Sequence, residues 1–345
     1  MKNKIRSSVV IGVFFVLCAA SAFGQKTTGY HLLNKIEVGG EGGWDILIAD
    51  PAGHRLYVSH ANKVVVIDTS TDKVVGEIPN TNGVHGIAFD EKRGRGYTTN
   101  GRDNTSTIFD LKTLKVIDTV KTGQNPDAIY YDQSTNRVFV FNGRSNDATV
   151  IDSATGKVAG TIALGGKPEF AAGNGKGMVY VNIEDKSEVV AIDSKTMAVK
   201  SHWTLAPTGE GPTGMAIDVK AHRLFLACDK KMVVMDADTG KVITDVATGD
   251  GTDGEEFDPG SKLAFSPNGG SATLTVIHED SKDKYSIVEN VPTQRGARTM
   301  AIDTKTHKVY LPTAQYGPAP APTKETPRPR APMLPNSFVI LVYGM

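Results

Sequence analysis

Short apolar segments separated by polar turns recur along this chain at nearly constant intervals. Strand-like segments with alternating apolar positions end in an aspartate at steps of 42, 42, 41 and 43 residues: Asp68, Asp110, Asp152, Asp193 and Asp236. Such alternation is typical of β-strands, and the Gly, Asn and Asp residues between the segments favour antiparallel hairpins. The pattern therefore predicts an all-β repeat protein.

A second series of strand ends keeps the same period. Each of its seven members closes an apolar strand with an acidic or amide residue: Asp50, Asp90, Asp132, Asn174, Asp218, Asp258 and Asp303. A repeat of about 40–45 residues with several short strands is typical of a β-propeller, in which each copy forms one four-stranded blade. We therefore predict a seven-bladed β-propeller of antiparallel blades.

The first repeat shows how one blade is built. An inner strand ends at Asp50 and is followed by strands at 55–59, 64–67 and 73–78. Tight turns with the pattern T-D-K or T-G-K follow the third strand of three copies. We expect the aspartates that precede these turns to accept backbone N–H groups and so to be structural: Asp68, Asp152 and Asp236.

The last repeat lacks one strand at the C-terminus. Residues 299–303, 308–311 and 337–343 supply three strands, and the sequence then ends. The segment 30–38 precedes the first full repeat and also has strand character. We predict that it completes the last blade, because closure of the ring removes exposed strand edges.

The first 24 residues have the pattern of an export signal. Lys2, Lys4 and Arg6 precede an apolar run at 9–20, and small residues follow. This is typical of a secretory signal peptide, so we expect a propeller at 25–345 and a periplasmic or secreted location. No later apolar run approaches about 18 residues, so we expect no membrane span.

The balance of charged residues gives little support to a nucleic-acid partner. The chain has 38 basic and 38 acidic residues, and loss of residues 1–24 leaves 35 basic against 38 acidic residues, a formal charge of −3. Nucleic-acid binding draws on phosphate neutralisation and has little support without a basic excess. After cleavage Cys228 is the only cysteine, so a mature monomer cannot form an internal disulfide. We also expect the protein to be a monomer.

The second strands of the repeats share a tetrapeptide pattern: YVSH at 57–60, YTTN at 97–100, FVFN at 139–142, FLAC at 225–228, FSPN at 265–268 and YLPT at 310–313. With the V-x-V-I-D segments, they make residues 30–345 resemble the YVTN-repeat β-propeller family, which includes secreted and periplasmic bacterial proteins. The resemblance implies an architecture rather than one activity, since such repeats occur in binding and surface proteins and are related to propeller domains of redox enzymes. The fourth copy departs from the pattern, with YVNI at 180–183.

Equivalent positions in the repeats identify candidate binding residues. The position five residues before each strand-end marker opens the inner strand: Asp45, His85, Asp127, Glu169, Thr213, Asp253 and Arg298. In a closed ring these side chains would surround one mouth of the central channel. The four carboxylates there can bind a divalent cation, a polyol or a cationic group, and their mutual repulsion would raise carboxyl pKa values. Alternatively, they only hydrate the opening, with His85 and Arg298 balancing the acids.

The ends of the second strands form a second candidate tier on the same face: His60, Asn100, Asn142, Asn182, Cys228, Asn268 and Thr313. The amides can bind a ligand, or can serve as left-handed turn residues in Asn-Gly pairs. His60 and His85 belong to adjacent blades and could converge with Asp45 on a transition metal. We expect Cys228 to be a buried small residue rather than a nucleophile.

A proline-rich insertion separates the second and third strands of the last repeat. Residues 314–336 contain seven prolines together with Lys324, Arg328 and Arg330. This composition favours an extended, partly stiff segment. Strand polarity places it on the face of the carboxylate mouth, where it can serve as a lid, as a partner-docking arm or only as a long loop.

No sequence motif identifies an enzyme. C-x-x-C-H is absent, which excludes the usual covalent c-type haem, and two tryptophans are too few for Trp-rich quinoprotein propellers. We expect an exported, non-enzymatic propeller that binds a small ligand, a cation or a protein partner through the channel mouth. The only cofactor indicated is a divalent cation. Two alternatives stay open: an enzyme, either a lactonase-like hydrolase or an accessory to periplasmic redox metabolism, and a surface or scaffold protein.

Overall fold

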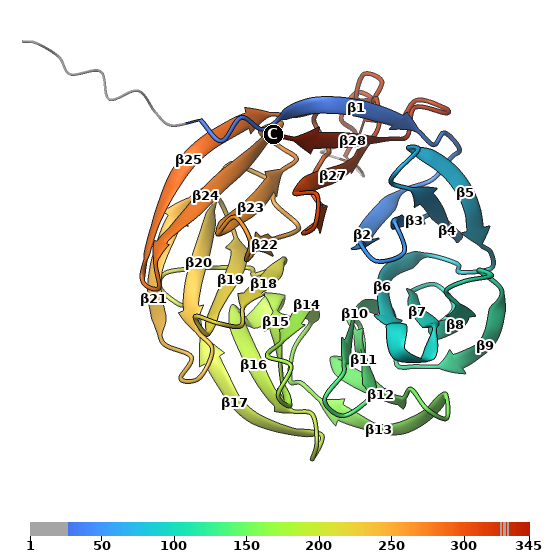
Figure 1. The fold of residues 1–345 in the computed structure, drawn as a ribbon, viewed down its shortest axis with the longest axis vertical. Helices are drawn as coiled ribbons and strands as arrows, with labels where there is room; N and C mark the ends of the chain where they lie inside the picture. The colour runs from blue at the N-terminus through green and yellow to red at the C-terminus, as the bar shows by residue number, and fades with distance from the viewer. Residues whose placement is uncertain (1–26, 325, 327–328, 330) are drawn as a thin grey trace, which may run out of the picture.

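Seven four-stranded antiparallel sheets surround a central axis in the computed structural model, which describes residues 27–324, 326, 329 and 331–345 (Figure 1). The predicted seven-bladed propeller is therefore confirmed. The predicted signal peptide at 1–24 lies outside the described residues. Within them, no helix is both long enough and apolar enough to cross a membrane.

Six blades are continuous in sequence, and their strands follow one another outward from the channel. Blade 1 consists of β2 (Trp44–Asp50), β3 (Arg55–His60), β4 (Lys63–Asp68) and β5 (Lys73–Ile78). Blade 2 consists of β6 (Val84–Asp90), β7 (Arg95–Asn100), β8 (Thr105–Asp110) and β9 (Val116–Lys121). Blade 3 consists of β10 (Pro126–Asp132), β11 (Arg137–Asn142), β12 (Asp147–Asp152) and β13 (Lys157–Ala163). Blade 4 consists of β14 (Pro168–Gly173), β15 (Met178–Ile183), β16 (Glu188–Asp193) and β17 (Ala198–Thr204). Blade 5 consists of β18 (Met215–Asp218), β19 (Arg223–Cys228), β20 (Lys231–Asp236) and β21 (Val242–Ala247). Blade 6 consists of β22 (Glu256–Asp258), β23 (Leu263–Asn268), β24 (Thr273–Ser281) and β25 (Lys284–Pro292). Two short 3-10 helices, η1 (Glu91–Arg93) and η2 (Glu184–Lys186), connect strands of blades 2 and 4.

Blade 7 is assembled from both ends of the described chain. Its inner strands are β26 (Ala301–Asp303), β27 (Lys308–Thr313) and β28 (Val339–Gly344), and its outermost strand is β1 (His31–Glu37). β1 runs antiparallel to β28, with His31 opposite Gly344 and Glu37 opposite Val339. Figure 1 shows the blue β1 beside the dark red β28. The predicted closure of the ring by the N-terminal strand is confirmed.

The core lies between neighbouring sheets. Successive side chains of a strand point to opposite faces, so each blade supplies apolar groups to both of its neighbours. Between blades 1 and 2, for example, Tyr57, Val64 and Val66 pack with Ile87 and Phe109, and none of these residues is more than 3% exposed. Burial of one such side chain contributes about 1.5–3 kcal/mol. The stability of each blade therefore depends on its neighbours.

The aspartates at the ends of the third strands hold the hairpins that follow. Asp68 Oδ1 accepts the backbone N–H groups of Ser70 and Thr71, each at 2.9 Å. Asp152 and Asp236 accept equivalent bonds in their own blades. The predicted structural role of these three aspartates is confirmed.

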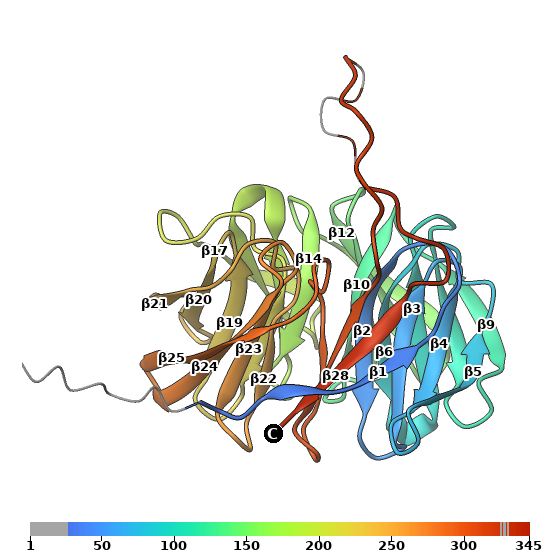
Figure 2. The ribbon, with the colours of Figure 1, turned by 90° about the horizontal axis from the view of Figure 1, so that it is seen from above.

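The proline-rich segment 314–336, called the arm below, leaves the ring between β27 and β28. Its base forms a short antiparallel stem, in which the Gly317 N–H donates to the Pro332 carbonyl and the Leu334 N–H to the Gln315 carbonyl, both at 2.8 Å. Figure 2 shows the arm projecting from one face of the ring, well beyond the loops of the other blades.

Candidate functional site

The inner strands begin at the same end of the channel and bring the first candidate tier together. Ion pairs join five of these side chains, one from each of five blades: Asp45, His85, Asp127, Asp253 and Arg298. The remaining two are Glu169, which pairs with a lysine of its own blade, and Thr213, whose hydroxyl donates to the Thr252 carbonyl at 3.4 Å. We call these seven residues the mouth ring.

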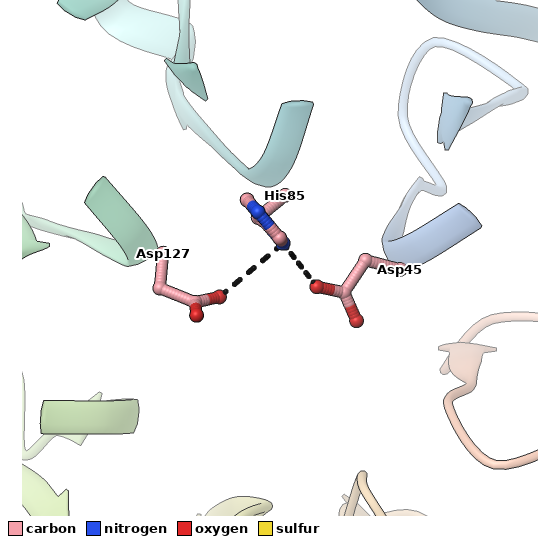
Figure 3. Close-up of side chains that lie close together, drawn as sticks. All are labelled: Asp45, His85 and Asp127. Carbon is pink, nitrogen blue, oxygen red and sulfur yellow. Dashed lines mark hydrogen bonds and ion pairs between the residues drawn. The ribbon is translucent and has the colours of Figure 1, made fainter. Parts of the chain in front are cut away.

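His85 lies between two carboxylates from the neighbouring blades. Its Nδ1 is 2.5 Å from Asp45 Oδ2 and 3.6 Å from Asp127 Oδ1 (Figure 3). One ligand atom from each of the three side chains lies within 4.8 Å of the other two, and all three residues are half-buried. Three adjacent blades thus direct one imidazole nitrogen and two carboxylate oxygens to a common point.

Arg298 spans the seam of the ring. Its Nε donates to Asp253 Oδ2 at 2.7 Å, and its Nη2 donates to the Trp44 carbonyl at 3.3 Å and lies 3.5 Å from Asp45 Oδ1. One guanidinium therefore connects blades 6, 7 and 1. It also holds Asp45 from the side opposite His85.

Lys167 is a member of the site that the sequence comparison missed. Its Nζ is 2.7 Å from Glu169 Oε1 and also pairs with Glu184. The equivalent position is Gly or Asn in the other six copies, and it has positive φ in several, including Gly83 at 64° and Asn125 at 52°. A long basic side chain at a position where the chain otherwise favours left-handed conformation is the signal that could have identified it.

Burial and neighbouring charge shift the ionisation of the mouth ring. Burial, reinforced by the charge of Asp127, raises the pKa of Glu169 to about 8, although Lys167 opposes this shift. Burial also raises the pKa of Asp127 to about 6 against the opposing charge of His85. Burial alone would lower the pKa of His85, but its hydrogen bond to Asp45 and the charges of Asp127, Asp45 and Glu169 raise it to about 9. The mouth ring therefore retains protons near neutral pH.

The second candidate tier lies inside the blades rather than around the opening. None of its members is more than 4% exposed: His60, Asn100, Asn142, Asn182, Cys228, Asn268 and Thr313. Burial raises the pKa of the Cys228 thiol to about 12, which fits the expected buried residue better than a nucleophile. The predicted convergence of His60 with His85 and Asp45 is not formed. His60 stacks on Phe338 instead, with ring centroids 4.4 Å apart.

Three asparagines of the second tier link the second and third strands of their own blades: Asn100, Asn142 and Asn268. Asn182 instead donates to the Thr213 and Gly214 carbonyls of the next blade. Asn100 Nδ2 donates to the hydroxyls of Thr105 and Thr107, at 3.0 and 2.8 Å, and Asn100 Oδ1 accepts from Thr98. Asn268 makes the same pair of bonds five and seven residues further along the chain. These asparagines are in extended strands, not in the left-handed turns expected of Asn-Gly pairs. The final Asn of the tetrapeptide is therefore structural.

Replacement of Asn100 by alanine is expected to destabilise the protein by about 1–3 kcal/mol, because it leaves buried hydroxyls without their donor. Urea denaturation measures this loss. The matched control is Asn82→Ala, since Asn82 is exposed and its side-chain amide donates to the exposed Asp103. Its expected effect is within about 0.5 kcal/mol. Equal losses in the two variants would contradict the structural role.

The glycine after such an asparagine makes room for a mouth side chain. A Cβ placed on Gly101 would lie 3.0 Å from His85 Nε2, and one on Gly269 would lie 2.8 Å from Arg298 Cβ. The Asn-Gly pairs thus combine a buried link within the blade with space for the mouth ring.

The arm stands on the same face as the mouth ring, as strand polarity predicts. Arg298 and Trp44 line a cavity of about 550 Å³ together with Tyr316 and Met333 of the arm. The Trp44 and Tyr316 ring centroids are 6.4 Å apart. A ligand at the mouth would therefore meet an aromatic wall on the side of blades 1 and 7.

Comparisons with known proteins support the fold alone. No protein family and no curated protein matches the chain. Among solved structures, hydrazine synthase of Kuenenia stuttgartiensis is similar with a TM-score of 0.69 and 15% sequence identity, over 79% of this chain and 94% of that chain. At this identity the similarity supports the propeller architecture and assigns no residue. The chain is a seven-bladed β-propeller whose channel mouth carries a charged ring.

Proposed function

We propose that this protein is an exported binding module of the YVTN-repeat type, which holds a divalent transition-metal cation at the channel mouth. The observation that carries the proposal is the convergence of Asp45, His85 and Asp127 within 4.8 Å. The leader-like residues 1–24 and the tetrapeptides support export and the family. Binding is favoured over acid–base catalysis because Arg298 and Lys167 already engage Asp253 and Glu169 in ion pairs.

The donor set determines which cation fits. Imidazole nitrogen suits Zn²⁺ and other late transition metals, whereas carboxylate oxygen suits Mn²⁺ and the alkaline-earth ions. One nitrogen with two carboxylates therefore favours Zn²⁺ or Mn²⁺ over Ca²⁺ or Mg²⁺. A cation bonded to His85 Nδ1 requires the neutral ring at that atom, so binding releases the proton that His85 otherwise holds. Affinity should consequently rise with pH.

The cavity beside the ring supplies space for a small ligand. It adjoins Arg298, which contacts Asp45, and it presents the faces of Trp44 and Tyr316. A guanidinium and two aromatic rings suit a ligand with an anionic group and an apolar part. In this proposal the cation fixes Asp45 and Asp127, and the ligand occupies the adjoining cavity.

The expected result is saturable binding of Zn²⁺ or Mn²⁺ to the EDTA-treated protein, measured by calorimetry and by thermal melting. At a cation concentration about 100 times Kd, the stabilisation should be about 2.7 kcal/mol. Asp45→Asn combined with Asp127→Asn should weaken binding at least tenfold. Asp103→Asn, on the exposed surface, is the control and should bind as the parent does. Equal affinity of the double variant and the control, or no binding at millimolar cation, would refute the cation site.

A further inference from the structure

The channel contains a second cavity, whose lining begins one residue further along the inner strands than the mouth ring. Its volume is about 300 Å³, and it is lined by the inner strands of blades 1 to 6. The walls are largely apolar and aromatic, with Ile46, Ile48, Tyr130 and Phe170 among them. None of the described residues that line it is basic. Outside blade 6, none of the lining side chains in the described part of the chain is charged.

Blade 6 places two carboxyl groups in this apolar wall. Glu256 occupies a position that is apolar or aromatic in the other six blades: Ile48, Ala88, Tyr130, Ala172, Ala216 and Ala301. Its neighbour Glu255 likewise stands where the other blades carry Leu, Ile, Ala or Met. The propeller fold does not require two successive glutamates at these positions, since the other six blades form with apolar residues there.

The two carboxyl groups are poorly compensated. Glu255 is 2% exposed, and its Oε2 accepts a hydrogen bond from the Ser266 hydroxyl at 2.7 Å. Its Oε1 is buried and has no hydrogen-bond partner in the part of the chain that the structure describes. Glu256 is partly exposed to the cavity, and no hydrogen bond or ion pair to its carboxyl group is found among the described residues. Burial raises the pKa of Glu256 to about 8 and that of Glu255 well above its ordinary value. An uncompensated carboxylate in apolar surroundings is destabilising unless a cation accompanies it.

We propose that the channel cavity binds an organic monoammonium compound, with the ammonium group on Glu256 and the apolar body against Tyr130 and Phe170. The cavity volume is at the lower end of the range for small-molecule sites, which suits a ligand of about ten non-hydrogen atoms. Aromatic faces attract ammonium groups as well as apolar groups, so both rings contribute. A bare metal cation fits less well, because only blade 6 offers charged oxygen ligands there. This site uses other side chains than the cation site at the mouth, which adjoins it along the inner strands.

The test compares an amine with its neutral analogue. Binding of phenethylamine and of 2-phenylethanol to the full protein is measured by calorimetry and ligand-observed NMR at about pH 8, where Glu256 is partly ionised. The parent should bind the amine at least tenfold more tightly than the alcohol. Glu256→Gln keeps the shape of the side chain but removes the charge, so it should reduce amine affinity to that of the alcohol.

Two controls separate this site from others. Glu91→Gln changes an exposed carboxyl group in η1 and should leave amine binding unchanged. Asp45→Asn changes the mouth ring, so it should weaken cation binding there and leave amine binding unchanged. The proposal is overturned if the parent does not bind phenethylamine at millimolar concentration, if the alcohol binds equally well, or if Glu256→Gln retains the parent's preference. Thermal melting of Glu256→Gln confirms that the ring remains folded.

Discussion

Deletion of residues 27–38 is expected to lower the melting temperature by more than about 10 °C. The deletion removes β1 and exposes the edge of β28, with which it pairs from His31 to Glu37. It also removes the buried side chains of Tyr30 and Ile36, each 3% exposed, and the hydrogen bond from the Tyr30 hydroxyl to the His307 carbonyl. Two such side chains contribute about 3–6 kcal/mol before the strand pairing is counted.

Point substitutions within β1 distinguish closure of the ring from a general effect of shortening. Ile36→Ala should cost about 2–5 kcal/mol, because it leaves a cavity between blades 7 and 1. Lys35→Ala is the matched control, since Lys35 is exposed in the same strand. Differential scanning calorimetry of the three variants measures these effects. A truncated protein that melts within a few degrees of the parent would show that the ring does not depend on its N-terminal strand.

The free energy of unfolding is expected to fall as pH rises from about 4 to about 9, because the mouth ring holds protons that the unfolded chain releases. Asp127 and Glu169 have raised pKa values, so the folded state binds more protons than the unfolded state above the ordinary carboxyl range. His85 acts in the same direction. Its contribution is complete below its ordinary pKa of about 6.5 and is lost as pH passes through about 9. The loss should be on the order of 1 kcal/mol or more, since one pKa unit corresponds to about 1.4 kcal/mol.

The difference between parent and variant isolates the mouth ring from other titrating groups. Asp127→Asn combined with Glu169→Gln should make the fall in the free energy of unfolding above about pH 4 shallower, measured by urea denaturation in EDTA. Glu255 and Glu256, which also have raised pKa values, contribute to the parent and the variant alike. Turn aspartates such as Asp68 have lowered pKa values, so they affect stability at lower pH and leave this window clear. Asp103→Asn should follow the parent curve. A variant curve parallel to the parent's would mean that the ring does not set the slope.

The ring could be predicted from the sequence because two independent markers repeat with one period. Asp50 and its equivalents end the inner strands, and Asp68 and its equivalents end the third strands, so both register and blade number follow. The position of Asp45 relative to Asp50 then places the mouth ring without any knowledge of contacts. Local hydrogen-bonding rules were sufficient for these residues.

Contacts between blades could not be read in the same way. His85 pairs with Asp45 and not with His60, and this depends on the orientation of the two imidazole side chains. Phe338, from a distant part of the chain, stacks on His60. Lys167 and Glu256 could have been recognised in the sequence, because each differs in residue type from the equivalent positions of the other repeats. Comparison of every register position, rather than of the one that opens the strand, would have found both.

The pairing of β1 with β28 also has a consequence for how the protein folds during synthesis. Of the described strands, β1 is synthesised first and β28 last, so the backbone groups that β1 directs toward β28 are paired only after β28 has been made. Contacts so distant in sequence are slow to form. Until then the outer edges of the incomplete ring are open to pairing with strands of other chains.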